Sequence, residues 1–254
     1  MKKIIRCENI VKSFGEGDEK RNVLDGVSVE INEGEFVSIM GPSGSGKSTL
    51  MYALSGMDLV DEGKVAFDSL DFSNLRENEL ADLRRTKMGF IFQQPTLLKN
   101  LNILDNIILP SMYNNRKNPG KITEKARTLM DIAGIPELEE RTITQASGGQ
   151  LQRVGICRAL MSDPKIIFGD EPTGALNSKT AHEIMRLLAK IHQTGTTILL
   201  VTHDVKIAAK TERVLFMIDG KIEGEYLPGP YDEARDDLNT REEKLNALMT
   251  KMKF

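Results

Sequence analysis

The chain has 254 residues, of which 40% are hydrophobic and 28% are charged, a composition typical of a folded globular protein rather than a disordered or fibrous one. Its 34 lysines and arginines are outnumbered by 37 aspartates and glutamates, so the net charge of -3 offers no broad positive surface to nucleic acid, and we expect no such partner. No apolar run approaches the roughly 20 residues of a membrane-spanning helix, and charged residues near the start argue against an export signal there.

The first part of the chain predicts sheet, a loop and a helix. Three β-rich segments are predicted to be strands, the first two forming an antiparallel pair and the third buried: 4–14, 23–31 and 35–40. The third strand ends in a Gly- and Ser-rich loop that leads into a predicted helix over 48–56. Cys7 and Cys157 form no CxxC pair and lie among aliphatic residues, so we expect reduced thiols in the core.

The middle of the chain predicts helices, and strands return after it. Segments 123–133 and 150–161 space their apolar residues as helices do, and we interpret about 96–162 as an inserted helical subdomain. Three later segments are predicted to be strands: 165–169, 196–202 and 213–218. A helix over 178–192 separates the first two, and this alternation implies parallel pairing. The predicted fold class is therefore α/β, with a mixed, largely parallel sheet, an N-terminal antiparallel β subdomain and the helical subdomain.

The end of the chain predicts an amphipathic helix after a polar stretch. Residues 240–243, Thr-Arg-Glu-Glu, have the pattern of a capping box and precede four spaced apolar residues, Leu245, Leu248, Met249 and Met252. We expect this helix either to pack on its own domain or simply to fray, or else to form a partner or dimer contact. The chain is accordingly divided into a main domain over 1–223 and a charged C-terminal extension over 224–254.

The strongest motif follows the third predicted strand. Residues 41–48, Gly-Pro-Ser-Gly-Ser-Gly-Lys-Ser, stand between a strand and a helix, as a phosphate-binding loop requires. Glycines let backbone N–H groups approach phosphate oxygens, and the helix directs its positive end at the same anion. Lys47 supplies a charge for the β- and γ-phosphates, and Ser48 supplies a hydroxyl for Mg²⁺. The candidate nucleotide-binding residues here are Gly41, Ser43, Gly44, Ser45, Gly46, Lys47, Ser48 and Thr49.

A second motif is the apolar strand 165–169 that ends in Asp170 and Glu171. A carboxylate at the C-terminal edge of a parallel strand, beside a phosphate loop, is placed to hold Mg²⁺, and Asp170 fits that role. Glu171, one residue further on, is placed to orient or deprotonate an attacking water. The competing interpretation is an exposed acidic pair that closes a strand.

A third motif, Ser147-Gly148-Gly149-Gln150, begins the predicted helix 150–161 and offers a second anion cradle at a helix N-terminus. One nucleotide cannot easily use both cradles within one subunit. Taken alone, this motif is more typical of an ordinary N-cap followed by a glycine turn.

In combination these motifs resemble the ABC ATPase family over about residues 4–222. The order of phosphate loop, Gln93, Ser-Gly-Gly-Gln, Asp170-Glu171 and His203 is similar to that of the family. The resemblance implies a homodimer in which two ATP molecules are sandwiched head to tail, each phosphate loop facing the partner's Ser-Gly-Gly-Gln loop.

The resemblance also assigns individual residues. It implies that Gln93 joins Ser48 and Asp170 around Mg²⁺, in a loop that also touches a membrane permease. It implies that His203 contacts the γ-phosphate and that Phe14 stacks on adenine. For Phe14 a core aromatic is the competing interpretation.

Two positions depart from the family pattern. Ala146 stands where the signature usually has Leu, which leaves the Ser-Gly-Gly-Gln cradle itself intact. Asn177 stands where the loop after Glu171 normally has Asp. For this reason the resemblance does not extend to the hydrolysis rate or to communication across the dimer.

Two further segments narrow the resemblance. Residues 171–176, Glu-Pro-Thr-Gly-Ala-Leu, and 55–58, Ser-Gly-Met-Asp, look like the subgroup of macrolide exporters, lipoprotein-release complexes and bacitracin-type peptide-resistance pumps. This implies an ATP-hydrolysing subunit at the cytoplasmic face of the cell membrane, with ATP and Mg²⁺ as cofactors and an integral membrane permease as partner. The expected role is export of, or resistance to, antimicrobial peptides, drugs or lipid-like compounds. Two alternatives stay open: a cell-division-type ATPase that transmits force to cell-wall hydrolases, and an ATPase without a membrane partner.

Overall fold

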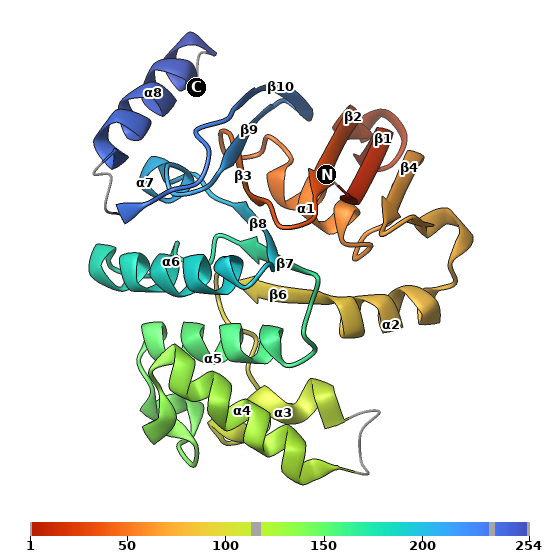
Figure 1. Ribbon diagram of the computed structural model, residues 1–254. Helices are drawn as coiled ribbons and strands as arrows, with labels where there is room; N and C mark the ends of the chain where they lie inside the picture. Colours follow the sequence, from red (N-terminus) through yellow and green to blue (C-terminus); the bar gives the residue numbers. More distant parts are fainter. Residues whose placement is uncertain (1, 113–117, 234–236, 253–254) are drawn as a thin grey trace. The chain divides into compact units, whose positions relative to one another are not determined.

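The computed structural model describes residues 2–112, 118–233 and 237–252 (Figure 1). One compact unit comprises Met1–Leu80 and Thr197–Phe254, and the other comprises Ala81–Thr196. Parts of the predicted domains lie outside the described residues, namely 1 and 113–117 of the main domain and 234–236 and 253–254 of the extension.

The first unit contains the predicted antiparallel sheet, in the order β2-β1-β4-β5. Its strands are β1 (Lys3–Phe14), β2 (Arg21–Asn32), β4 (Glu62–Phe67) and β5 (Leu70–Asp71), with short 3-10 turns η1 (Gly17–Glu19) and η2 (Phe72–Asn74). The β1 strand pairs antiparallel with β2 on one side and with β4 on the other. Ile5 and Cys7 are buried on one side of the sheet, because alternate residues of a strand face the same side. A register shift between Cys7 and Ile10 interrupts this alternation, and Ile10 is buried as well.

The same unit holds a second set of strands, in the order β10-β9-β3-β8. They are β3 (Phe36–Met40), β8 (Thr197–Val201), β9 (Arg213–Ile218) and β10 (Lys221–Tyr226). The β3 strand is parallel to β8 and β9, and every residue of β3 and β8 is buried, as expected of apolar strands covered on both faces. The β10 strand pairs antiparallel with β9 through Tyr226, so the domain boundary predicted at 223 falls inside a strand.

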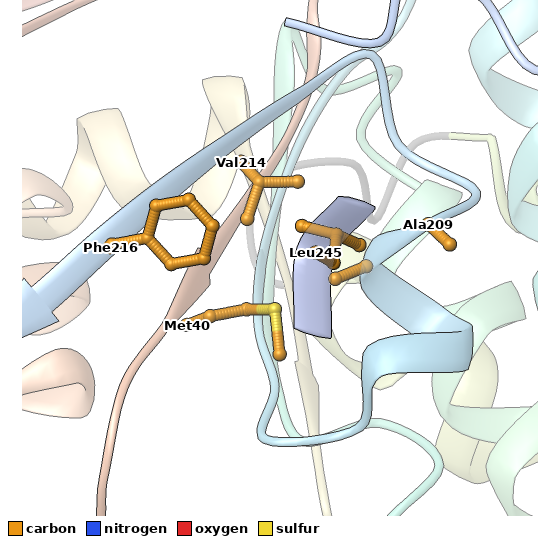
Figure 2. Close-up of a cluster of buried hydrophobic side chains, with 6 residues drawn as sticks. Met40, Ala209, Val214, Phe216 and Leu245 are labelled. Carbon is orange, nitrogen blue, oxygen red and sulfur yellow. The ribbon is translucent and has the colours of Figure 1, made fainter. Parts of the chain in front are cut away.

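The C-terminal helix α8 (Leu238–Lys251) packs on its own unit. Figure 2 shows Leu245, which is 0% exposed, among Met40, Val214 and Phe216, close to the end of the short helix α7 (Val205–Ala208). Of the possibilities expected for this helix, packing on its own domain is the one observed.

The predicted start of α8 was wrong. The helix begins at Leu238 with Asp237 as N-cap, so Thr240 lies inside its first turn rather than capping it. The backbone N–H of Arg241 donates to the carbonyl of Asp237 at 3.0 Å, and the Arg241 Nε donates to the Asp237 Oδ2 at 2.8 Å. These bonds extend the helix toward Asp237, past the capping-box pattern.

The second unit pairs two parallel strands and packs a group of helices beside them. The strands are β6 (Met88–Phe92), which follows α2 (Glu77–Lys87), and β7 (Ile166–Asp170). The helices are α3 (Ile103–Met112), α4 (Pro119–Ala133), α5 (Gly148–Leu160) and α6 (Ser178–Gln193), with short turns η3 (Pro136–Leu138) and η4 (Ile143–Gln145). Helices α3, α4 and α5 pack on one another, and α5 also packs on β6 and α6. Among the described residues, none of the helices combines the length and apolarity needed to span a bilayer.

Both cysteines lie in the interior, as predicted. Cys7 on β1 and Cys157 on α5 are free and buried. Burial disfavours the thiolate and raises the pKa of each thiol to about 12. Neither group is therefore a nucleophile near neutral pH.

Candidate nucleotide-binding site

The Gly-rich loop lies where the sequence predicts it, between β3 and α1 (Lys47–Leu54) in the first unit. Gly44 and Gly46 adopt left-handed backbone conformations with φ of 81° and 98°, which residues with a Cβ rarely adopt. A Cβ at Gly41 would overlap the carbonyl oxygen of Met217. The loop therefore needs glycine both for its turn and for its close packing on β9.

The interior of this loop is built for an anion. Lys47 is 8% exposed, and its ammonium donates to the carbonyl of Pro42 across the loop at 2.7 Å. The Ser45 hydroxyl oxygen is buried without a hydrogen-bond partner in the described part of the chain. Such a group is costly unless a further ligand satisfies it, so the residues present fit a phosphate group. Ser48 and Thr49 are half-buried in the first turn of α1.

Two other predicted residues belong to the same unit. Phe14 ends β1 and is 49% exposed, so the interpretation of a core aromatic was wrong. His203 lies two residues after the end of β8 and is exposed. The segment after it is fixed, because the Asp204 N–H donates to the Thr202 hydroxyl at 3.1 Å and the Asp204 carboxylate accepts from the Lys206 N–H at 2.8 Å.

The second unit brings Gln93 and Glu171 together. In the parallel register of β6 and β7, Phe92 pairs with Asp170, so the residues that follow, Gln93 and Glu171, leave adjacent strand ends. A Cβ at Gly174 would lie 3.0 Å from the Gln93 Nε2 and 3.1 Å from the Glu171 Oε2. The amide and the carboxylate thus flank one glycine, although Gln93 is far from Glu171 in the sequence and no local sequence pattern indicates this arrangement.

The two acidic residues differ in backbone conformation. Asp170 is the last residue of β7, whereas Glu171 has φ of 46°, in the left-handed region that a non-glycine residue seldom occupies. Both are half-buried, and the Glu171 carbonyl accepts from the Gly174 N–H at 2.9 Å. Strained backbone of this kind persists where the surroundings hold it, and it is concentrated at functional sites.

The Ser147 to Gln150 loop caps helix α5 in the second unit. The Gln150 N–H donates to the Ser147 hydroxyl oxygen at 3.3 Å, and the Ser147 N–H donates to the Gln150 Oε1 at 2.9 Å. A Cβ at Gly149 would overlap the Thr180 side chain, so the loop packs closely on α6, whereas Gly148 is exposed. Asn177 caps α6, since its Oδ1 accepts from the Thr180 N–H at 3.0 Å.

Candidate metal ligands are few and are mostly neutral oxygens. In the described ranges, no group of three or more His, Cys, Asp and Glu could hold a metal ion. Of the residues predicted to hold Mg²⁺, Ser48 offers a hydroxyl in the first unit, whereas Gln93 offers an amide and Asp170 a carboxylate in the second. That donor set suits Mg²⁺, which takes oxygen ligands and often shares them with substrate phosphates.

Comparison with known proteins gives concordant matches. The family model for ABC transporters matches residues 24–174. The macrolide export ATP-binding/permease protein MacB of Chlorobaculum tepidum is 42% identical over 86% of this chain, which spans 33% of that protein's length. The uncharacterized ABC transporter ATP-binding protein MJ0796 of Methanocaldococcus jannaschii is 43% identical over 87% of this chain and 96% of that protein. The dimeric structure of MJ0796 in a post-hydrolysis state, bound to ADP and Pi, has a TM-score of 0.82 at 39% identity and covers 89% of this chain and 100% of that one. These matches confirm the predicted fold class.

Proposed function

The chain belongs to the ABC transporter family and is an ATP-binding ATPase of that family, and on this premise we propose that it drives a membrane permease by closing as a dimer on ATP. The observation that carries the proposal is the loop 41–48, with the Lys47 ammonium buried at the N-terminus of α1. Such a loop combines a full positive charge, inward N–H groups and a helix dipole around one anion.

ATP is proposed to bind with its phosphates in this loop. Lys47 would donate to β- and γ-phosphate oxygens, and the half-buried Ser48 would place its hydroxyl on Mg²⁺ with Gln93 and Asp170. The metal neutralises charge on the phosphates when it is bound. Phe14, at the exposed end of β1, would stack on adenine.

Glu171 is proposed to handle the water. Its carboxylate lies beside Gly174 together with the Gln93 amide, so one group can accept a proton from water while the other orients it. The water oxygen forms a bond to the γ-phosphorus, the bond between that phosphorus and the bridging oxygen breaks, and ADP and phosphate result. His203 would donate to the γ-phosphate as charge moves onto it.

Dimerisation is proposed because the chain carries two cradles for one nucleotide. The MJ0796 relative, which this chain matches over nearly its whole length, has a dimeric structure. We propose a head-to-tail homodimer in which each loop 41–48 meets the partner's Ser147 to Gln150 loop around one ATP.

The permease and the transported compounds are proposed from the MacB relatives. Their name joins an ATP-binding part to a permease, and this chain spans about a third of their length. We propose a peripheral location at the cytoplasmic face of the membrane, with the helical part at about 96–162 contacting the permease. The proposed role is export of, or resistance to, macrolide-like drugs, antimicrobial peptides or lipid-like compounds.

Substitution of Glu171 by Gln tests the proposed water chemistry. The variant should bind ATP with unchanged affinity, form a stable ATP-loaded dimer and lose about 100-fold or more of the hydrolysis rate, because the amide cannot take a proton. Glu124→Gln, on the exposed face of α4, is the matched control and should hydrolyse ATP normally. A Glu171→Gln protein with near-normal hydrolysis would remove Glu171 from this role.

The same variant tests the partner. Tagged Glu171→Gln protein, loaded with ATP in native membranes and gently solubilised, should copurify with a multi-span permease that mass spectrometry identifies. Recovery of the ATPase dimer alone would contradict the permease proposal. Recovery of a membrane protein whose loss impairs cell division without changing drug tolerance would contradict the export role.

A further inference from the structure

The exposed ring of Phe14 has a cation on one of its faces. The Lys12 Nζ lies over the ring at 5.4 Å from its centroid, while the Phe14 side chain remains 49% exposed. A cation over an aromatic face is attracted by the negative charge density of that face. The ammonium occupies one face of the ring, while about half of the Phe14 side chain remains accessible to another planar group.

Lys12 does not behave as an ordinary surface lysine. Its side chain is only 13% exposed, and the ammonium donates to the Asp58 Oδ1 and to the Leu59 carbonyl, both at 2.6 Å. Lysine ammonium groups are strongly hydrated and normally extend into water. Two acceptors of the same segment thus hold this cation at a fixed place beneath the ring.

The segment that holds Lys12 is itself bonded to α1 and to β1. The N–H groups of Met57 and Asp58 donate to the Tyr52 carbonyl of α1, at 2.9 and 3.2 Å. The Ser13 N–H donates to the Asp61 Oδ2 at 2.7 Å, and this bond is the main reason why the pKa of Asp61 lies below its ordinary value. The helix that begins in the phosphate loop is therefore connected, through residues 57–61, to the strand end that carries Phe14.

We propose that Lys12, anchored by Asp58, is a positioning residue that holds the Phe14 ring ready for the base of the nucleotide. The proposal rests on the nucleotide site proposed above and adds to it a residue that does not touch the nucleotide. An exposed aromatic side chain samples several rotamers, and fixing it before binding removes part of the entropy cost of stacking. Lys12 should therefore affect recognition of the base and leave recognition of the phosphates unchanged.

The test separates base from phosphate by comparing two ligands on the full chain. ATP carries both parts, whereas inorganic tripolyphosphate carries only the phosphates, and isothermal titration calorimetry gives the affinity for each. Lys12→Met keeps the apolar stem and removes the charge. We expect it to weaken ATP binding about 2- to 5-fold, on the scale of an exposed cation–π contact, and to leave tripolyphosphate binding unchanged.

Five further variants, one of them a double variant, define the result. Phe14→Ala should weaken ATP binding more strongly, and adding Lys12→Met to it should cause no further loss, because the ring that Lys12 positions is gone. Lys12→Arg should restore most of the affinity, since guanidinium also stacks on aromatic rings. Asp58→Asn, which releases the ammonium without removing it, should give a smaller loss that again spares tripolyphosphate. Lys3→Met is the matched control, because Lys3 also stands on β1 and bonds a carboxylate, that of Glu30 at 2.6 Å, and it should change neither affinity.

The possible results distinguish failure of the proposed role of Lys12 from failure of the proposed nucleotide site. Unchanged ATP binding in Lys12→Met and Asp58→Asn, with a loss in Phe14→Ala, would overturn the inference and keep the site. Equal losses for ATP and tripolyphosphate would also overturn it, because Lys12 would then act on the phosphates or on the loop. If Phe14→Ala left ATP binding unchanged, stacking on Phe14 itself would be wrong.

Discussion

Two glycine-bearing loops precede helices in this chain, and they are built for different tasks. In the loop 41–48 a lysine ammonium is buried, the Ser45 hydroxyl has no partner among the described residues, and two glycines have positive φ. In the loop 147–150 the polar groups of Ser147 and Gln150 bond to each other, and the loop contains no cation. The first loop needs an anion to satisfy it, whereas the second is largely satisfied by itself.

This difference suggests that the two loops have different roles in binding the phosphates of one nucleotide. The Ser147 oxygen accepts from the Gln150 N–H, which leaves the hydroxyl proton to be donated elsewhere. The N–H groups of Gly148 and Gly149 stand at the first two positions of α5, where helices have no internal acceptors. A loop of this kind adds donors to an anion that another loop already holds. The asymmetry therefore favours a dimer in which the first loop binds and the second completes the site.

The largest expected effect comes from removing the charge of the first loop. Lys47→Ala should lower ATP affinity by about 100-fold or more, because charge-assisted bonds to two phosphates contribute roughly 1.5 to 3 kcal/mol each. Titration calorimetry with ATP measures the loss. Lys64→Ala, an exposed lysine on β4, is the control and should bind as the original chain does. A Lys47→Ala protein with ordinary affinity would show that the first loop does not hold the phosphates.

The second loop should affect turnover and not binding. Ser147→Ala removes the cap of α5 and should cost about 1 kcal/mol of stability, measured by urea unfolding. It should leave the ATP affinity of the single subunit unchanged and lower kcat about 10-fold or more, as loss of a donor to developing charge does.

A matched cap nearby separates the two effects. Thr142 stands five residues earlier, and its N–H and hydroxyl both donate to the Gln145 Oε1, at 3.0 and 3.2 Å. Thr142→Ala should therefore lose similar stability and keep kcat. If both variants lost turnover equally, the effect of Ser147 would come from stability alone, and the comparison between the two loops would fail.

Elements of the fold were predictable where the hydrophobic pattern of a single segment identified them. Strand β9 was predicted over the residues that form it, and α6 differs from its predicted range by one residue. A continuous apolar run and a strongly amphipathic pattern each identify the type of element from the sequence alone. Strand β10 was missed because its alternate residues are exposed and polar, and α2 was missed because Leu80 is its only buried residue. In both, pairing or packing with distant residues outweighs local preference.

In the candidate site, too, features set by a local motif were predictable, whereas features set by distant residues were not. The glycines of the loop 41–48 were visible as a motif, since local turn chemistry demands them. The placement of Gln93 and Glu171 on either side of Gly174 follows from the register of two parallel strands, and sequence spacing does not reveal that register. The ammonium beneath Phe14 likewise depends on Asp58, which lies 46 residues after Lys12.

The smallest expected effect concerns Asn177, the position that departs from the family. Its side chain caps α6, the helix on which the second loop packs through Gly149 and Thr180. An aspartate can accept the same Thr180 N–H and adds a negative charge at a helix N-terminus, so Asn177→Asp should raise the free energy of unfolding by about 0.5 kcal/mol. Asn177→Ala removes the acceptor and should lower it by about 1 kcal/mol.

If capping is the whole role of this side chain, the hydrolysis rate of Asn177→Asp should stay within about threefold of the original, since a change near 0.5 kcal/mol corresponds to a factor of roughly two. Urea unfolding and steady-state ATP hydrolysis, measured on both Asn177 variants, check the two parts separately. A rate that rose tenfold while stability changed as expected would mean that the residue acts on the nucleotide across the dimer. The second loop would then depend on a negative charge that this chain lacks at position 177. Its weaker binding of an anion would be due to Asn177 as well as to the hydrogen bonds between Ser147 and Gln150.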